Sequence, residues 1–154
     1  MKMYKIPITG NEWQGDLSLP YQALVQFYYA YNNKDMDIMN QNWYQSEEIA
    51  MNNPLVGVKR GWEEIKQFYK NNFICKAKVY MEFHDYTIDE TKEMFYTVGR
   101  ERGYFQLGKT KNKLNIHTSR IFKKIDSTWK QVYHHSSMDN PELLKRYRKA
   151  VLVR

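Results

Sequence analysis

Asn52-Asn53-Pro54-Leu55-Val56-Gly57-Val58-Lys59-Arg60-Gly61-Trp62-Glu63-Glu64-Ile65-Lys66-Gln67-Phe68-Tyr69 is the stretch at which the periodicity of this chain changes. Its first half holds a proline and two glycines, which are typical of turns. Its second half has apolar residues at helical spacing, which predicts a helix from about Gly61 to Asn72. The residues before the stretch have mostly helical periodicity, and those after it alternate as strands do. This order predicts an α+β domain with helices against one face of an antiparallel sheet.

Two helices are predicted before this stretch. Apolar residues recur at i, i+3/i+4 and i+7 from Leu24 to Tyr31, which predicts a helix over residues 19–32. Ser18 is its expected N-cap, and Pro20 falls in its first turn. A second, short helix is predicted from Met36 to about Tyr44. Residues 1–17 show no clear period, so we expect an N-terminal arm followed by a single domain over residues 18–154.

Four strands and a helix are predicted in the second half of the chain. Alternating apolar and polar residues predict strands over residues 76–86, 93–107, 114–125 and 128–138. A polar hairpin is expected at residues 87–92 and a tight turn at Asp126-Ser127. Gly99 and Gly103 indicate a bulge or a sharp bend within the second of these strands. Asn140-Pro141-Glu142 is typical of a helix start, so a C-terminal helix is predicted from about residue 140.

Size and composition restrict the class of protein. A chain of 154 residues is long enough for one well-buried domain, and its single cysteine cannot form an internal disulfide. The net charge of +7 comes from short, scattered clusters of lysine and arginine, so we expect no nucleic-acid partner. No apolar run is long enough to cross a bilayer, and the N-terminus has no signal-peptide pattern. We therefore expect a cytoplasmic protein.

The order of elements and two motifs resemble the nuclear transport factor two-like superfamily, which is also called SnoaL-like. The first motif is Asn53-Pro54 with Gly57 and Gly61, which is similar to the segment of ketosteroid isomerases that joins the pocket rim to the third helix. The second, Thr118 to Ser136, resembles the closing hairpin of the association (hub) domain of calcium/calmodulin-dependent protein kinase. The resemblance implies a cone-shaped, curved antiparallel sheet wrapped around the N-terminal helices and enclosing a pocket.

The same resemblance argues against steroid isomerase chemistry. It implies that Asn53 stands at the position of the catalytic base and Phe27 at that of the oxyanion-hole tyrosine, while Arg120 falls on or near the second aspartate. An asparagine cannot accept a proton as a carboxylate does. We therefore expect no ketosteroid isomerase activity, and whether the protein is an enzyme at all stays open.

The resemblance to the hub domain implies a different site. Its two pocket arginines match Arg100 and Arg120. An arginine on an apolar strand face needs an anionic partner, because burial of an unpaired guanidinium is costly. We predict a small, anionic or aromatic ligand held in an internal pocket by four residues, Arg100, Arg120, Tyr96 and His134. The alternative is that both arginines pair across the sheet with carboxylates, the candidates being Glu82, Glu101 and Asp85.

His134 and His135 are adjacent on a strand, so their side chains point to opposite faces. The hub pattern places His134 in the pocket, whereas a gap-free match to the isomerase pattern places His135 there. The histidines do not form a metal-binding pattern, and the chain has no dinucleotide or phosphate-binding loop, so we expect neither a metal nor a cofactor.

Self-association is the expected partnership. The aromatic content is high, at 16%, and we expect a homodimer through the outer face of the sheet. The aromatic residues assigned to that interface are Tyr80, Tyr86, Trp129 and Tyr133. Two alternatives remain: an acid/base enzyme of the same fold (a dehydratase, cyclase or hydrolase) using Tyr31, Asp85 and His134, or a non-catalytic homo-oligomerisation module.

Overall fold

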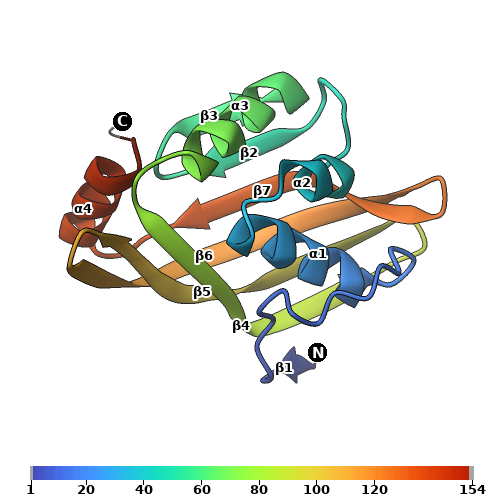
Figure 1. The fold of residues 1–154 in the computed structure, drawn as a ribbon. Coiled ribbons are helices and arrows are strands. Elements are labelled where there is room, and N and C mark those ends of the chain that lie inside the picture. The colour runs from blue at the N-terminus through green and yellow to red at the C-terminus, as the bar shows by residue number, and fades with distance from the viewer. Residues whose placement is uncertain (1, 153–154) are drawn as a thin grey trace.

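The predicted helices and strands are present in the structure, a computed structural model that describes residues 2–152 (Figure 1). The helices are α1 (Pro20–Asn32), α2 (Met36–Asn42), α3 (Gly61–Phe73) and α4 (Pro141–Leu152). The strands are β1 (Met3–Tyr4), β2 (Ala50–Asn53), β3 (Gly57–Arg60), β4 (Lys78–Glu90), β5 (Met94–Leu107), β6 (Thr110–Ile125) and β7 (Thr128–Ser137). None of the helices within the described residues is long and apolar enough to span a membrane.

The strands form one curved sheet of mixed direction. Its order is β1-β4-β5-β6-β7-β2-β3, and all neighbours are antiparallel except β2 and β7. The expectation of a wholly antiparallel sheet is therefore corrected at one edge. The sequence did not reveal this edge because β2 and β3 have four residues each, too few for alternation to stand out.

A β-bulge bends β4 where it passes Gly99 of β5. The register shifts between His84 and Thr87, and Asp85 adopts a positive φ of 50°. A Cβ at Gly99 would lie 2.8 Å from both Phe83 Cε1 and Tyr86 Cβ, so only glycine fits opposite the bulge. The glycine predicted to mark a bulge thus lies opposite one, but the bulge itself is in β4 and not within residues 93–107. The bulge also lets β4 continue to Glu90, so the hairpin predicted at residues 87–92 is shorter than expected.

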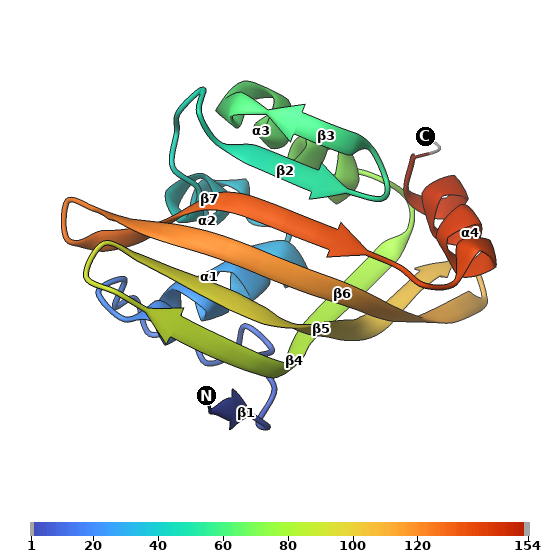
Figure 2. The same cartoon turned by 180° about the vertical axis from the view of Figure 1, so that it is seen from behind.

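Helices α1, α2 and α3 lie against the concave face of the sheet (Figure 1), and no helix within residues 2–152 covers its opposite face (Figure 2). α1 begins at Pro20, but Leu19 occupies its N-cap position without a side-chain bond. The predicted cap is wrong because the Ser18 hydroxyl donates to Asp16 Oδ1 at 2.6 Å instead. α4 closes one end of the sheet, where the Tyr147 ring lies 5.1 Å from that of Phe105.

Two of the four aromatic residues assigned to the outer face lie in the core. Trp129 is fully buried, its ring centroid 5.0 Å from that of Phe95, and Tyr86 stacks on Phe83 at 5.1 Å. The bulge in β4 turns Tyr86 inward, a change that simple alternation does not predict. Tyr80 and Tyr133 are half-buried.

The N-terminal segment is attached to the edge of the sheet. Met3 and Tyr4 of β1 pair with β4, and the backbone of Ile8 exchanges two hydrogen bonds of 2.9 Å with that of Phe83. Ile8 has no exposed surface, so this segment supplies one core residue as well as an edge strand.

Candidate functional site: an internal cavity

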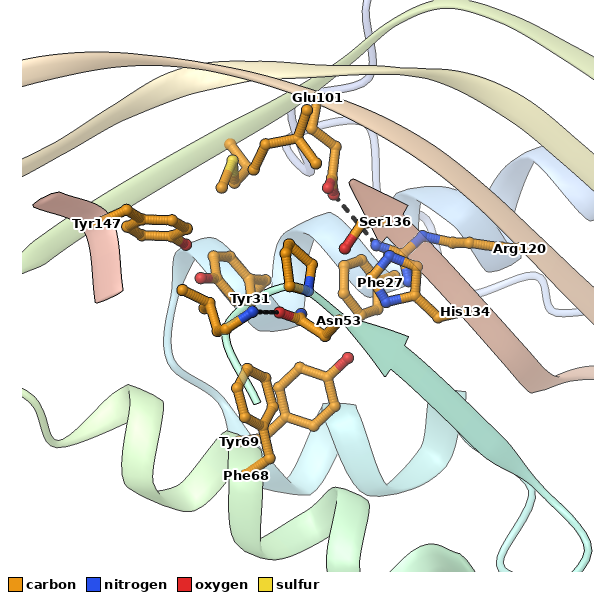
Figure 3. A pocket seen from close by; sticks show the side chains of 14 residues that line it. Phe27, Tyr31, Asn53, Phe68, Tyr69, Glu101, Arg120, His134, Ser136 and Tyr147 are labelled. Atoms are coloured by element: carbon orange, nitrogen blue, oxygen red, sulfur yellow. Dashed lines mark hydrogen bonds and ion pairs between the residues drawn. The ribbon is translucent and has the colours of Figure 1, made fainter. Parts of the chain in front are cut away.

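A small cavity lies between the concave face of the sheet and the helices. Its volume is about 40 Å³, enough for about three water molecules. Side chains from β4 to β7, α1, α3, α4 and the turn after β2 surround it (Figure 3). The lining residues with polar groups are Tyr31, Asn53, Tyr69, Glu101, Arg120, His134, Ser136 and Tyr147.

A buried ion pair forms one wall of the cavity. Arg120 Nη2 donates to Glu101 Oε2 at 3.1 Å, and the Arg120 side chain is 1% exposed. Arg120 Nη1 donates to Gln131 Oε1 at 2.7 Å, and the Thr118 hydroxyl donates to Glu101 Oε1 at 2.8 Å. The guanidinium carbon also lies 3.7 Å from the centre of the Phe27 ring. The charge of each partner is therefore compensated inside the protein.

Within the described part of the chain, His134 lines the cavity with both ring nitrogens unpartnered, and the Nε of Arg120 is unpartnered as well. His134 is 4% exposed, and neither Nδ1 nor Nε2 has a hydrogen-bond partner among the described residues. Burial lowers the pKa of its imidazole well below 6.5, and electrostatic repulsion from the nearby Arg120 lowers it further. The ring is consequently neutral at physiological pH, with one nitrogen able to donate a hydrogen bond and the other able to accept one.

Asn53 lies at the rim of the cavity as part of a turn. Its Oδ1 accepts a hydrogen bond of 2.8 Å from the backbone N–H of Leu55, which is the geometry of an Asx turn. Figure 3 shows this bond beside the rings of Tyr31 and Tyr69. Burial raises the pKa of Tyr69 to about 12 and that of Tyr31 well above its usual 10. Both phenols are therefore protonated.

The structure brings together only two of the four predicted site residues. Arg120 and His134 line the cavity, whereas Arg100 and Tyr96 lie on the exposed, outer face of the sheet. The prediction of two arginines converging in one pocket is wrong, because the residues of β5 that face inward are those of the other parity, including Phe95 and Glu101. For Arg120 the alternative, a pair with Glu101, is confirmed.

The open question of which histidine faces the pocket is settled by a second bulge. Ile121 pairs with Tyr133 and Phe122 with Gln131, so Val132 is an extra residue in β7. Gln131 and His134 therefore both face inward, although they are three positions apart, and His135 is exposed. Strict alternation over β7 cannot place both Gln131 and His134 on the inner face of the sheet. For this reason the sequence did not indicate that Gln131 faces inward.

Other candidate groups lie outside the cavity. Asp85, named as a possible acid or base, faces the outer side, and its Oδ2 accepts a hydrogen bond of 3.3 Å from Arg102 Nη2. Among residues 2–152, no group of three or more His, Cys, Asp or Glu side chains is placed to hold a metal ion.

The fold and the cavity define an α+β cone. Comparison with known proteins shows the family to which the chain belongs. Residues 21–141 match the SnoaL-like domain, so the chain belongs to the SnoaL-like family. No curated protein matches the chain.

Solved structures of the same fold come from several organisms. A Streptomyces avermitilis protein of the NTF2-like family, proposed to be a dehydratase, has a TM-score of 0.71 and 17% identity over 79% of this chain and 94% of that chain. A ketosteroid isomerase-like protein from Erwinia carotovora atroseptica has a TM-score of 0.65 and 14% identity, over 84% of this chain and all (100%) of that chain. The CaMKII hub of S. rosetta has a TM-score of 0.64 and 17% identity, over 80% and 97% of the two chains. At these identities the similarity concerns the fold alone.

Proposed function

We propose that this SnoaL-like protein binds a small, neutral, polar molecule in the internal cavity, with His134 as its hydrogen-bond partner. The observation that carries the proposal is a buried imidazole, 4% exposed, with both ring nitrogens unpartnered beside a cavity. An unmet donor and acceptor inside a protein cost free energy, and a ligand that met both would recover it.

The ion pair favours a neutral ligand over the anion expected from the sequence. Arg120 is already neutralised by Glu101, so an added carboxylate would also face the negative charge of Glu101. The aromatic walls formed by Phe27, Phe68 and Tyr69 suit a flat ligand such as a small amide or azole.

The test follows the ring nitrogens of His134 by ¹⁵N NMR during titration with acetamide, imidazole and acetate. At about 10 mM probe, a binding free energy of about 2.7 kcal/mol is enough for half saturation. We expect the His134 signals to shift with acetamide and imidazole and to respond much less to acetate. His134→Phe should abolish binding, while His135→Phe, on the exposed face of the same strand, should retain it. Absence of any His134 shift with the neutral probes would refute the proposal.

A second candidate is acid/base catalysis in the same cavity. The lowered pKa of His134 leaves its imidazole free to accept a proton, and the protonated phenol of Tyr69 could donate one. This predicts that the protein exchanges the α-hydrogens of a small ketone for deuterium in D₂O, which ¹H NMR detects. Exchange that is lost in His134→Gln and kept in His135→Gln would favour the enzyme. Exchange at the solvent rate would favour simple binding.

We also propose that the protein forms a homodimer through the outer face of the sheet. Tyr96 and Val98 of β5 are 40% and 49% exposed on this face, which none of the described helices covers (Figure 2). Val98→Lys should weaken self-association in sedimentation equilibrium. Ile74→Lys, an equally apolar exposed position outside the sheet, should not. A monomeric wild-type protein would refute the proposal, and a mass well above that of a dimer would favour an oligomerisation module instead.

A further inference from the structure

A second, larger hollow adjoins the cavity on the other side of α3. Its volume is about 280 Å³, seven times that of the inner cavity at about 40 Å³. We call it the outer chamber, and it lies between α3, the turn before β3 and the end of α4. The residues that line it are Val56, Lys59, Glu64, Gln67, Phe68, Asn71, Asn72, Val151 and Leu152.

The outer chamber and the inner cavity share one lining residue. Phe68 of α3 lines both spaces. Beside it, Tyr31 of the inner cavity donates its hydroxyl hydrogen to Oδ1 of Asn72, in the outer chamber, at 3.1 Å. One aromatic side chain and one hydrogen bond thus link the linings of the two spaces.

Asn72 carries a second unmet polar group. The residue is 6% exposed, and its Nδ2 has no hydrogen-bond partner among the described residues. Its oxygen is held by Tyr31, so the amide nitrogen is left as an unmet donor on a residue that lines the outer chamber. Together with His134, the linings of the two spaces therefore contain two buried polar side chains whose unmet groups a ligand could satisfy.

We propose that one elongated, neutral molecule occupies both spaces, its small polar head on His134 and its less polar body in the outer chamber, where an acceptor atom meets Asn72. This inference rests on the proposed function. A head of about three non-hydrogen atoms contributes at most about 4.5 kcal/mol, because even the best small ligands reach only about 1.5 kcal/mol per non-hydrogen atom. A body in the outer chamber adds to this binding, and Phe68 must change rotamer to let the molecule pass.

The chemistry of the chamber restricts the body. Its charged lining residues are one lysine, Lys59, and one glutamate, Glu64, so it has no net charge to attract an ionic group. Val56, Phe68 and Val151 give it apolar walls. An aliphatic or arylalkyl chain with an internal carbonyl or ether oxygen fits these features, as in N-acylated or alkoxy amides.

The experiment compares acetamide with 3-butoxypropanamide, which carries an amide head, an ether oxygen and an alkyl tail. Both are titrated by NMR, with His134 ring nitrogens and the Asn72 side-chain amide as reporters. The longer probe should shift both reporters and bind at least about tenfold more tightly, because an added alkyl body buries several methylene groups. Gln67→Trp, which places an indole in the outer chamber, should remove that advantage. Lys70→Trp, an exposed position of α3 outside the chamber, should not.

The outcomes separate this inference from the proposed function. If acetamide shifts His134 and the longer probe binds no more tightly, the two-chamber inference is overturned and the proposed function stands. If the longer probe shifts the Asn72 signal but not the His134 signals, its amide head does not reach His134 while its body occupies the outer chamber. The inference then also fails. If neither probe shifts His134, both proposals are refuted. An equal loss of affinity in Gln67→Trp and Lys70→Trp would likewise overturn the placement of the body.

Discussion

Arg120 of β6 and Glu101 of β5 form an ion pair that runs diagonally across two strands. The direct cross-strand partner of Arg120 is Thr97, and that of Glu101 is Ile116, yet Nη2 and Oε2 lie 3.1 Å apart. The long arginine side chain extends along the inner face of the sheet beneath α1, with Phe27 stacked on its guanidinium. The pair thereby joins the wall of the cavity to the packing of the first helix.

Removal of one partner of this pair should be costly. We expect Arg120→Met to lower the free energy of unfolding by about 3–5 kcal/mol, because it leaves the Glu101 carboxylate buried without its counter-charge. Arg102→Met, which breaks the exposed pair with Asp85, should cost about 0–1 kcal/mol. Urea unfolding measures both. The double variant Arg120→Met/Glu101→Leu should recover part of the loss, and equal costs for the two single variants would contradict this account.

The neutral state of His134 should make stability depend on pH. Burial lowers its pKa in the folded protein well below 6.5, whereas in the unfolded chain the ring takes up a proton near 6.5. The unfolded chain therefore binds more protons in mildly acidic solution. The contribution of His134 is fully present above pH 6.5 and is lost as the pH falls below it, by up to about 1.4 kcal/mol per pH unit.

Urea unfolding between about pH 7.5 and pH 5.5 checks this dependence. His134→Gln should flatten the profile, because glutamine does not titrate. His135→Gln, on the exposed side of β7, should keep the wild-type slope. A profile that is the same in both variants would show that His134 does not control it.

The bend in the sheet should not tolerate a side chain at Gly99. Gly99→Val would place a Cβ 2.8 Å from Phe83 Cε1 and 2.9 Å from the carbonyl oxygen of His84. We expect a loss of about 1–3 kcal/mol from this overpacking, measured by thermal unfolding. Ile74→Val, at an exposed position outside the sheet, keeps a β-branched side chain, and its effect should stay within about 0.5 kcal/mol. A Gly99→Val protein as stable as Ile74→Val would show that the bend adapts.

Restoring a carboxylate at the rim should not produce isomerase activity. Asn53→Asp keeps an oxygen for the Leu55 turn, so the variant should fold. However, Phe27 and Arg120 supply no oxyanion hole of the isomerase type, and a cavity of about 40 Å³ does not admit a four-ring steroid. We expect no isomerisation of a β,γ-unsaturated ketosteroid, followed by absorbance of the conjugated product. Turnover above the rate in buffer would refute this.

The sequence predicted the fold better than the site. Long runs of alternation from Val79 to Phe122 indicate which residues share a face, because each strand has enough positions for the pattern to be clear. Alternation does not say which of the two faces is the inner one, and both faces of β5 carry charged and aromatic residues. Arg100 was placed inside on the resemblance to the hub domain, although Glu101 was the residue of the inward parity.

The two bulges account for the other differences. Asp85 and Val132 each add a residue to one strand, so Tyr86 and Gln131 turn inward against the simple pattern. A bulge depends on the pairing of two strands that are distant in sequence, and a single strand carries only a weak signal for it. Gly99 gave such a signal for the first bulge, but no glycine lies opposite the second.

The extra residue at Val132 determines which polar side chains of β7 face the inner side of the sheet. With the extra residue, β7 presents both Gln131, which binds Arg120, and His134, which borders the cavity. Loss of one residue at this point would return β7 to strict alternation, and one of these two side chains would exchange places with an outward neighbour. Related chains that differ here by a single insertion or deletion can therefore keep the same cone and present a different set of polar groups to whatever it encloses.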